Sequence, residues 1–495
     1  MRDLIASTSR PVLPPTARFA HLRRMAALFV VVSAGLAAGP VSRPNVLFLA
    51  ADDLRMNLGC YGDRVAKTPN LDRLARRGVT FERAYCQQAL CNPSRASLLT
   101  GLRPDTLRVW NLPTHFRENL PDAVTLPQYF KQQGYFTQNV GKIFHNFRTT
   151  IEGDPVSWSV PAVLHFASHS TDVALLDGGT APPNTAKTKG TEARDVPDDA
   201  YFDGRVAAAA IKALQECSSR GKPFFLGVGF WKPHLPFNPP QRYWDLYRRE
   251  DIPPPRNPTA PVNAPRMALA NASEGKTAKP DEVAELRHGY YAATSYMDAQ
   301  LGKVIAELDR LGLADSTVIV FWSDHGFHLG EQGLWGKTSN YENAAQVPLI
   351  VVTPGMRRAG AKAAGLVELL DLYPTLVELC GLPPREGLAG VSLRPMLDDP
   401  AVKVKPAAFT QAPRPANIQG GQSDTMGYSM RDDRYRYTEW REWSSGRVRA
   451  RELYDHQADP DESVNRAGDA QLAETVQALS ARLAKQFPPH ALPAE

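Results

Sequence analysis

Cysteine is scarce in this sequence, and neither sign of charge dominates it. Five cysteines among 495 residues are an odd number and too few for a disulfide scaffold. We expect no bridges, although four of the cysteines would suffice for one or two. The net charge of +5 at pH 7 is small for this length. It is too diffuse to indicate a nucleic-acid partner, but it is compatible with a locally basic cleft for anionic substrates.

Long hydrophobic runs are also missing. The one candidate, residues 25–38, follows Arg23 and Arg24, and its length of about 14 residues is too short to span a bilayer comfortably. Small residues close the run at 34–39. We interpret residues 1–39 as a signal peptide region that directs the protein to the periplasm or outside the cell. An uncleaved N-terminal anchor is the alternative, and no stable membrane span is expected elsewhere.

The composition is that of a soluble globular protein, with 43% hydrophobic and 22% charged residues. The length suffices for one large domain and one smaller domain. After Pro413 and Gly420 the pattern changes to a strand-like alternation over 428–440, followed by a helix at 470–486. We therefore predict a large domain at 40–415 and a small C-terminal α+β domain at 416–495.

Three continuous apolar runs, at 45–51, 224–230 and 317–323, predict strands buried on both faces of a parallel sheet. Each run is followed by residues that could do chemistry: Asp52 and Asp53, a loop with His234, and Asp324 and His325. Such sheets bind ligands beyond the carboxyl ends of their strands. Three carboxylates there would repel one another, and a hard divalent cation bound by oxygen ligands would relieve the repulsion. We expect Ca²⁺, with Mg²⁺ as second choice; for the Asp52-Asp53 pair alone, a solvated turn is the alternative.

Helical signals alternate with strands, which predicts an α/β class for the large domain. The expected helices are at 69–77, 126–133, 204–217, 281–311 and 366–380. A further strand is expected at 347–353, and another element follows the 126–133 helix at 136–142.

A further helix is expected to begin near Cys91, because Pro93 suits a first helical turn and Gly101 a helix end. Cys91 would then lie at a helix N-terminus, where backbone N–H groups favour an anion. Arg95 is one turn further along the same face, and its planar fork suits a sulfate or phosphate. A buried structural cysteine at an ordinary helix start is the alternative.

The stretch from Cys91 to Gly101 resembles the signature of the type I sulfatase family, in which this cysteine is oxidised to formylglycine. Within that family the chain is most similar to the iduronate-2-sulfatase group, over residues 44–461. The other matching stretches are 52–55, 59–63, 140–145, 232–237, 324–326, 334–340 and 427–431. Asn92 departs from the family pattern, in which a small residue is commoner. His328 and Gln332 also differ from the iduronate group, so its substrate does not transfer directly.

The resemblance implies an alkaline-phosphatase-like fold: a large mixed, mostly parallel sheet flanked by helices, with a small C-terminal domain built on an antiparallel sheet. It also implies a metal site and a set of catalytic residues. The Ca²⁺ ligands would be Asp52, Asp53, the modified Cys91, Asp324 and His325. The catalytic residues would be Cys91, Arg95, Lys142, His145, His234 and Lys337.

The implied reaction is hydrolysis of a sulfate ester by a formylglycine hydrate. One hydroxyl of the hydrate attacks sulfur and the other later expels sulfate. Arg95, Lys142 and Lys337 would neutralise the sulfate oxygens; for Lys337, contact with a substrate carboxylate is the alternative. His234 would protonate the leaving alcohol, and His145 would assist the hydrate.

The implied substrate is a sulfated carbohydrate, with a 2-O-sulfated uronic acid residue as one candidate. The implied partner is a formylglycine-generating or maturase enzyme. The alternatives are a phosphate or phosphonate monoester hydrolase of the same superfamily, and a silent sulfated-glycan binding protein in which Cys91 stays unmodified.

Overall fold

The computed structural model describes residues 43–145, 153–165, 190–270, 280–416 and 424–488. The predicted signal peptide at 1–39 lies outside these ranges. Among the helices that they contain, none combines the length and hydrophobicity needed to cross a lipid bilayer. All five cysteines lie in the described ranges and are free thiols.

The larger sheet has seven strands in the order β3-β4-β1-β5-β8-β2-β9. Strand β8 runs antiparallel to its neighbours β5 and β2, and the other neighbouring strands are parallel. The predicted mixed, mostly parallel sheet is therefore confirmed. Its strands are β1 (Asn45–Asp52), β2 (Val79–Tyr85), β3 (Phe136–Gly141), β4 (Phe224–Pro233), β5 (Thr317–Ser323), β8 (Gln346–Val352) and β9 (Lys362–Glu368).

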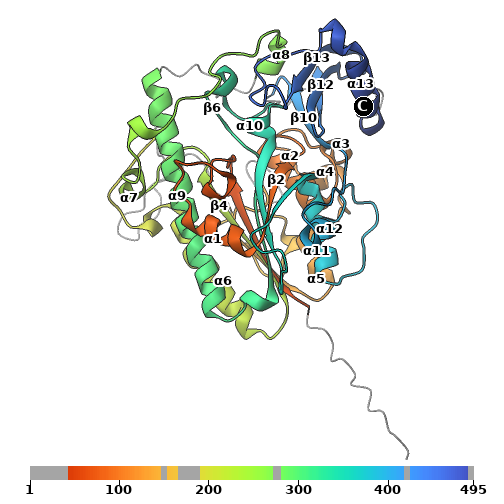
Figure 1. Ribbon diagram of the computed structural model, residues 1–495. Helices are drawn as coiled ribbons and strands as arrows, with labels where there is room; N and C mark the ends of the chain where they lie inside the picture. Colours follow the sequence, from red (N-terminus) through yellow and green to blue (C-terminus); the bar gives the residue numbers. More distant parts are fainter. Residues whose placement is uncertain (1–42, 146–152, 166–189, 271–279, 417–423, 489–495) are drawn as a thin grey trace, which may run out of the picture. The chain divides into compact units, whose positions relative to one another are not determined.

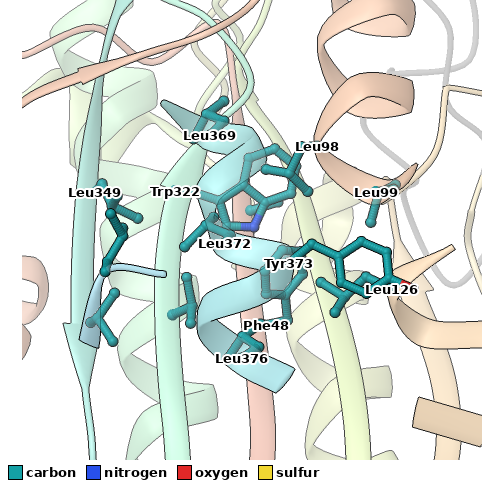
Figure 2. Close-up of a cluster of buried hydrophobic side chains, with 14 of the residues drawn as sticks. Phe48, Leu98, Leu99, Leu126, Trp322, Leu349, Leu369, Leu372, Tyr373 and Leu376 are labelled. Carbon is teal, nitrogen blue, oxygen red and sulfur yellow. The ribbon is translucent and has the colours of Figure 1, made fainter. Parts of the chain in front are cut away.

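Helices cover both faces of this sheet (Figure 1). Side chains that alternate along one strand therefore enter two different cores. Phe48 and Trp322 pack beneath α2, α5 and α11, as Figure 2 shows, whereas Leu47 and Phe321 pack beneath α1, α6 and α9. The long helices are α1 (Pro69–Arg77), α2 (Cys91–Thr100), α5 (Leu126–Gln132), α6 (Phe202–Ser219), α9 (Pro280–Arg310) and α11 (Leu372–Leu379). Burial on both faces explains why the central strands are continuous apolar runs.

Shorter elements connect the long ones. The short helices are α3 (Pro104–Leu107), α4 (Phe116–Asn119), α7 (Gln241–Trp244), α8 (Arg266–Leu269), α10 (Glu342–Ala345) and α12 (Arg394–Asp398). Two short strands, β6 (His328–Leu329) and β7 (Trp335–Gly336), pair with each other after the end of β5.

The second sheet is antiparallel and has the order β10-β11-β12-β13. It comprises β10 (Ala408–Arg414), β11 (Thr425–Arg431), β12 (Tyr435–Glu442) and β13 (Val448–Asp455), and helix α13 (Ala473–Gln486) packs on it (Figure 1). This arrangement confirms the α+β character predicted for the C-terminal region. Because β10 precedes residue 416, the sheet includes a strand from the segment that the sequence assigned to the larger domain.

The helix predicted at 366–380 is wrong in its first half. Residues Lys362–Glu368 form strand β9, which pairs in parallel with β2, and α11 begins only at Leu372. The apolar residues of this stretch were assigned to a helix because a short apolar run does not distinguish a strand from a buried helix. Strand β2 was not predicted, because Glu82 and Arg83 interrupt its apolar pattern.

The single strand predicted over 428–440 is a hairpin of β11 and β12. Its turn is stabilised by the Asp432 carboxylate, which accepts hydrogen bonds from the backbone N–H groups of Arg434 and Tyr435. An aspartate that bonds the backbone two residues ahead is a turn signal that the alternating pattern concealed.

Candidate active site

Three elements bring the predicted metal ligands together. Asp52 and Asp53 lie at the end of β1, Asp324 and His325 follow β5, and Cys91 begins α2. Cys91 Sγ is 3.4 Å from Asp52 Oδ1 and 3.3 Å from His325 Nε2. His325 Nε2 is 3.4 Å from Asp53 Oδ1 and 3.6 Å from Asp324 Oδ2. We call these five buried residues the carboxylate cluster.

The start of α2 places position 91 inside the cluster. Leu90 is extended, the helix begins at Cys91, and no side chain caps its first turn. The helix ends where predicted, because Gly101 adopts a left-handed conformation with φ 70°. Every residue of α2 is buried, so the N-terminus of the helix, with Cys91 as its first residue, lies in the protein interior. Such an N-terminus favours a negatively charged group.

Asn92, which departs from the family signature, has a structural partner. Its side-chain amide donates to the backbone carbonyl groups of Asn111, at 2.9 Å, and Thr114, at 2.7 Å. The larger side chain therefore ties the loop before α4 to the start of α2.

Arg95 is placed differently from the role predicted for it. The side chain is fully buried, and its Nε donates to Asp324 Oδ2 at 2.8 Å. Its Nη atoms donate to the carbonyl groups of Lys142, Ile143 and Ala51. Because the guanidinium fork is directed at protein acceptors, this geometry does not support direct contact with sulfate oxygens. Arg95 instead orients Asp324 through this hydrogen bond.

Two lysines pair with the aspartates beside the thiol. Lys142 Nζ forms a short ion pair with Asp52 Oδ2. Lys337 Nζ donates to Asp53 Oδ1 at 2.7 Å and Oδ2 at 2.9 Å, and it lies 3.6 Å from Cys91 Sγ. Both ammonium groups are therefore next to the position where a nucleophile at residue 91 would act.

Backbone carbonyl groups fix the tautomers of two histidines. Nδ1 of His325 lies 2.9 Å from the Gly326 oxygen, and Nδ1 of His234 lies 2.7 Å from the Leu235 oxygen. A carbonyl can only accept, so each Nδ1 carries the proton and each Nε2 faces the cluster. For His234 this atom is 3.9 Å from Asp53 Oδ2. A hydrogen bond from the opposite ring nitrogen to a backbone carbonyl is typical of histidines that bind metals or transfer protons.

Burial and charge set the protonation states. Although burial opposes ionisation of Asp52, Lys142 and the neighbouring cationic groups hold its pKa well below the usual value. Burial, reinforced by Asp52, raises the pKa of the Cys91 thiol, so the unmodified residue is a neutral and weak nucleophile. Burial lowers the pKa of His325 to about 4. Burial and then Lys142 lower the pKa of His145.

The donor set fits a hard divalent cation. Asp52, Cys91, Asp324 and His325 each offer one ligand atom within 4.8 Å of the others, and Asp52, Asp53, Cys91 and His234 form a second, overlapping group. Three carboxylates in so small a space match the oxygen ligands that Ca²⁺ and Mg²⁺ prefer.

The two residues that differ from the iduronate group, His328 and Gln332, are buried. His328 Nε2 lies 2.8 Å from Ser339 Oγ. Gln332 donates to the carbonyl group of Asp461 at 3.0 Å. Both side chains thus hold the β6–β7 loop in place, and neither is presented on the surface.

Sequence reasoning missed several supporting residues. Ser94 Oγ donates to the Asp324 carbonyl at 2.5 Å, and Ser323 Oγ accepts from the Leu54 N–H at 3.0 Å. The indole of Trp231 packs against Lys142 and His234, with centroid distances of 4.2 and 4.4 Å. The sequence around a serine or an aromatic residue gives no signal of such contacts.

Comparisons with known proteins match this chain to one family over most of its length. The family model described as Sulfatase matches residues 44–382, and the model for the C-terminal region of N-sulphoglucosamine sulphohydrolase matches residues 330–487. Iduronate 2-sulfatase of Homo sapiens is 34% identical, and the match covers 88% of this chain and 93% of that protein.

Two solved structures are similar in fold. The phosphonate monoester hydrolase of Agrobacterium radiobacter has a TM-score of 0.73 and 24% identity, over 90% of this chain and 95% of that one. A protein in complex with its substrate D-glucosamine-2-N,6-O-disulfate has a TM-score of 0.71 and 22% identity, over 90% of this chain and 98% of that one. The predicted alkaline-phosphatase-like fold is confirmed. Because the family model covers most of the sequence and a sulfatase relative spans nearly all of it, the chain belongs to the sulfatase family of hydrolytic enzymes.

Proposed function

We propose that this protein removes sulfate from a sulfated carbohydrate, using a formylglycine made from Cys91 and a bound divalent cation. One observation carries the proposal: the thiol of Cys91, at the N-terminus of α2, lies within 3.6 Å of a carboxylate, an imidazole and an ammonium group. A buried neutral thiol is poorly suited to attack sulfur itself. A formylglycine hydrate at the same position would supply a hydroxyl nucleophile and a second hydroxyl for release of sulfate.

Ca²⁺ is the proposed cation, with Mg²⁺ as second choice, and Asp52, Asp53, Asp324, His325 and residue 91 would hold it. When bound, such a cation supplies positive charge that favours the ionised form of a hydroxyl group. Arg95 would orient Asp324 through its hydrogen bond at 2.8 Å.

The two lysines and two histidines would act on the substrate. Lys337 contacts Cys91, and Lys142 pairs with Asp52, which contacts the same thiol, so we assign both lysines to the sulfate oxygens, where negative charge develops. Nε2 of His234 faces the cluster and, once protonated, would donate its proton to the leaving alcohol oxygen. We assign His145, buried beside Lys142, to proton transfer at the hydrate.

The proposed substrate is a saccharide with a 2-O-sulfated uronic acid residue, a choice supported by the iduronate 2-sulfatase relative. Formylglycine at position 91 requires a formylglycine-generating or maturase enzyme as a partner. The signal peptide interpretation places the protein in the periplasm or outside the cell. The division into a catalytic domain at 40–415 and a C-terminal domain at 416–495 remains a prediction.

The first experiment measures the mass of the Cys91 peptide from the purified protein. An aldehyde in place of the thiol is expected. The protein is then assayed on a panel of defined sulfated saccharides, for which we expect desulfation of 2-O-sulfated uronic acid residues. A modified protein that binds these saccharides without turnover would instead be a glycan-binding protein.

Phosphate or phosphonate ester hydrolysis is the second candidate, because a phosphonate monoester hydrolase shares the fold. The ratio of kcat/KM for matched aryl sulfate and aryl phosphate esters distinguishes the two activities. A ratio below one would refute the sulfatase assignment in favour of this second candidate.

A further inference from the structure

The backbone that carries Asp53 is held by three side chains from elsewhere in the chain. The N–H of Asp53 donates to Asp324 Oδ1 at 3.2 Å, and the N–H of Leu54 donates to Ser323 Oγ at 3.0 Å. The N–H of Arg55 donates to the hydroxyl of Tyr290 at 2.9 Å. These bonds hold an unusual conformation, because Asp53 has a φ of 62°, in the left-handed region that residues with a side chain seldom adopt.

The Tyr290 hydroxyl stabilises this conformation through two hydrogen bonds. Its hydroxyl accepts from the Arg55 N–H and donates to the Asp53 carbonyl at 2.8 Å, so a single oxygen bridges the turn. The ring is fully buried in α9 and packs against Phe237 and Phe327, with centroid distances of 5.6 and 6.0 Å. The hydroxyl is therefore fixed with respect to the long helix, independently of the turn that it holds.

We propose that Tyr290 is a positioning residue of the cation site, and this inference rests on the proposed function. By bonding the carbonyl of Asp53, its hydroxyl keeps that residue left-handed and directs the carboxylate toward His325 Nε2, which lies 3.4 Å away. Without the hydroxyl, the turn keeps only its bonds to Asp324 and Ser323, and we expect it to relax toward an ordinary φ, which moves the carboxylate away from Asp52 and Asp324. The cation would then lose one of its ligands, while the rest of the fold stays intact.

The neighbouring residue provides a matched control. Tyr291 is also buried in α9, and its hydroxyl also makes two hydrogen bonds, donating to Asp63 Oδ2 at 2.8 Å and accepting from Asn57 Nδ2 at 2.7 Å. Neither partner belongs to the carboxylate cluster. Tyr290→Phe and Tyr291→Phe therefore remove the same atom from the same helix, but only the first removes a contact to a proposed cation ligand.

The test measures Ca²⁺ binding by calorimetry on the full-length protein after removal of metal with EDTA. Groups that orient a metal ligand typically change the affinity by about 10- to 100-fold. We expect Tyr290→Phe to raise the Kd for Ca²⁺ by about this factor and Tyr291→Phe to leave it within about twofold. Thermal unfolding should show a loss of stability for both variants, because each leaves two hydrogen-bonding partners without a hydroxyl. Saturating Ca²⁺ should restore most of the activity of Tyr290→Phe.

Two results would overturn the inference. If both variants bind Ca²⁺ as tightly as the parent protein, or if both weaken binding equally, Tyr290 has no special part in the site. If the parent protein itself binds no divalent cation, the metal part of the proposed function is refuted as well. The parent titration therefore separates failure of the positioning role from failure of the proposed function.

Discussion

Replacing Arg95 by lysine separates two roles for this side chain. The guanidinium donates to Asp324 and to the carbonyl groups of Lys142, Ile143 and Ala51. Lysine keeps the positive charge but offers one nitrogen in place of three. Each buried acceptor that loses its donor costs about 1–3 kcal/mol of the free energy of unfolding. If lysine leaves two of the acceptors unpaired, the protein is destabilised by about 2–6 kcal/mol. Because Asp324 also loses a fixed partner, we expect Ca²⁺ affinity to fall by about 10- to 100-fold.

The assay combines thermal unfolding, Ca²⁺ calorimetry and steady-state kinetics on one preparation. Arg103→Lys is the matched control, since Arg103 is a buried arginine that pairs with Glu368, at 2.9 and 3.0 Å, away from the carboxylate cluster. The control should lose stability without losing Ca²⁺ affinity. If Arg95→Lys leaves both the Tm and the Ca²⁺ affinity unchanged and only raises KM for sulfate esters, Arg95 contacts the substrate and the structural reasoning fails.

Three further changes test the site and its surroundings. Asp324→Asn should weaken Ca²⁺ binding and turnover together, by tenfold or more; an unchanged Kd would contradict the cation site. His234→Ala should reduce kcat/KM far more for alkyl sulfates than for activated aryl sulfates, and equal losses would exclude its acid role. Glu331 forms ion pairs with both Arg55 and Arg287. Replacing it by Gln should lower the free energy of unfolding at pH 7 by about 3–5 kcal/mol. Although burial raises the pKa of Glu331, both arginines hold it well below the usual 4.5. The stability that the carboxylate provides is therefore present above pH 4.5 and is lost progressively as the pH falls below it. A difference in Tm between the parent protein and Glu331→Gln that stays constant down to pH 3 would refute this.

The sequence determined the elements whose signals are local. The runs that form β1, β4 and β5 are apolar throughout because helices cover both faces of the sheet. Such runs can be recognised as strands from the sequence alone. The limits of α2 follow from Pro93 and Gly101, whose backbone preferences are intrinsic. Since polar residues at the ends of parallel strands gather at one edge, the grouping of Asp52, Asp53 and Asp324 could also be predicted.

Tertiary structure alone decided what each side chain contacts. Lys362–Glu368 is a strand because β2 offers it hydrogen-bonding partners, although its own apolar residues fit a helix equally well. The sequence predicts that Arg95 contacts sulfate oxygens, whereas in the folded protein it donates hydrogen bonds to a carboxylate and three carbonyl groups. Tyr290 belongs to the apolar stripe of a long helix, and no pattern shows that its hydroxyl meets the backbone of Asp53, 237 positions earlier. Local sequence encodes periodicity and turn preference, whereas the partner of a buried polar group depends on which distant backbone the fold brings beside it.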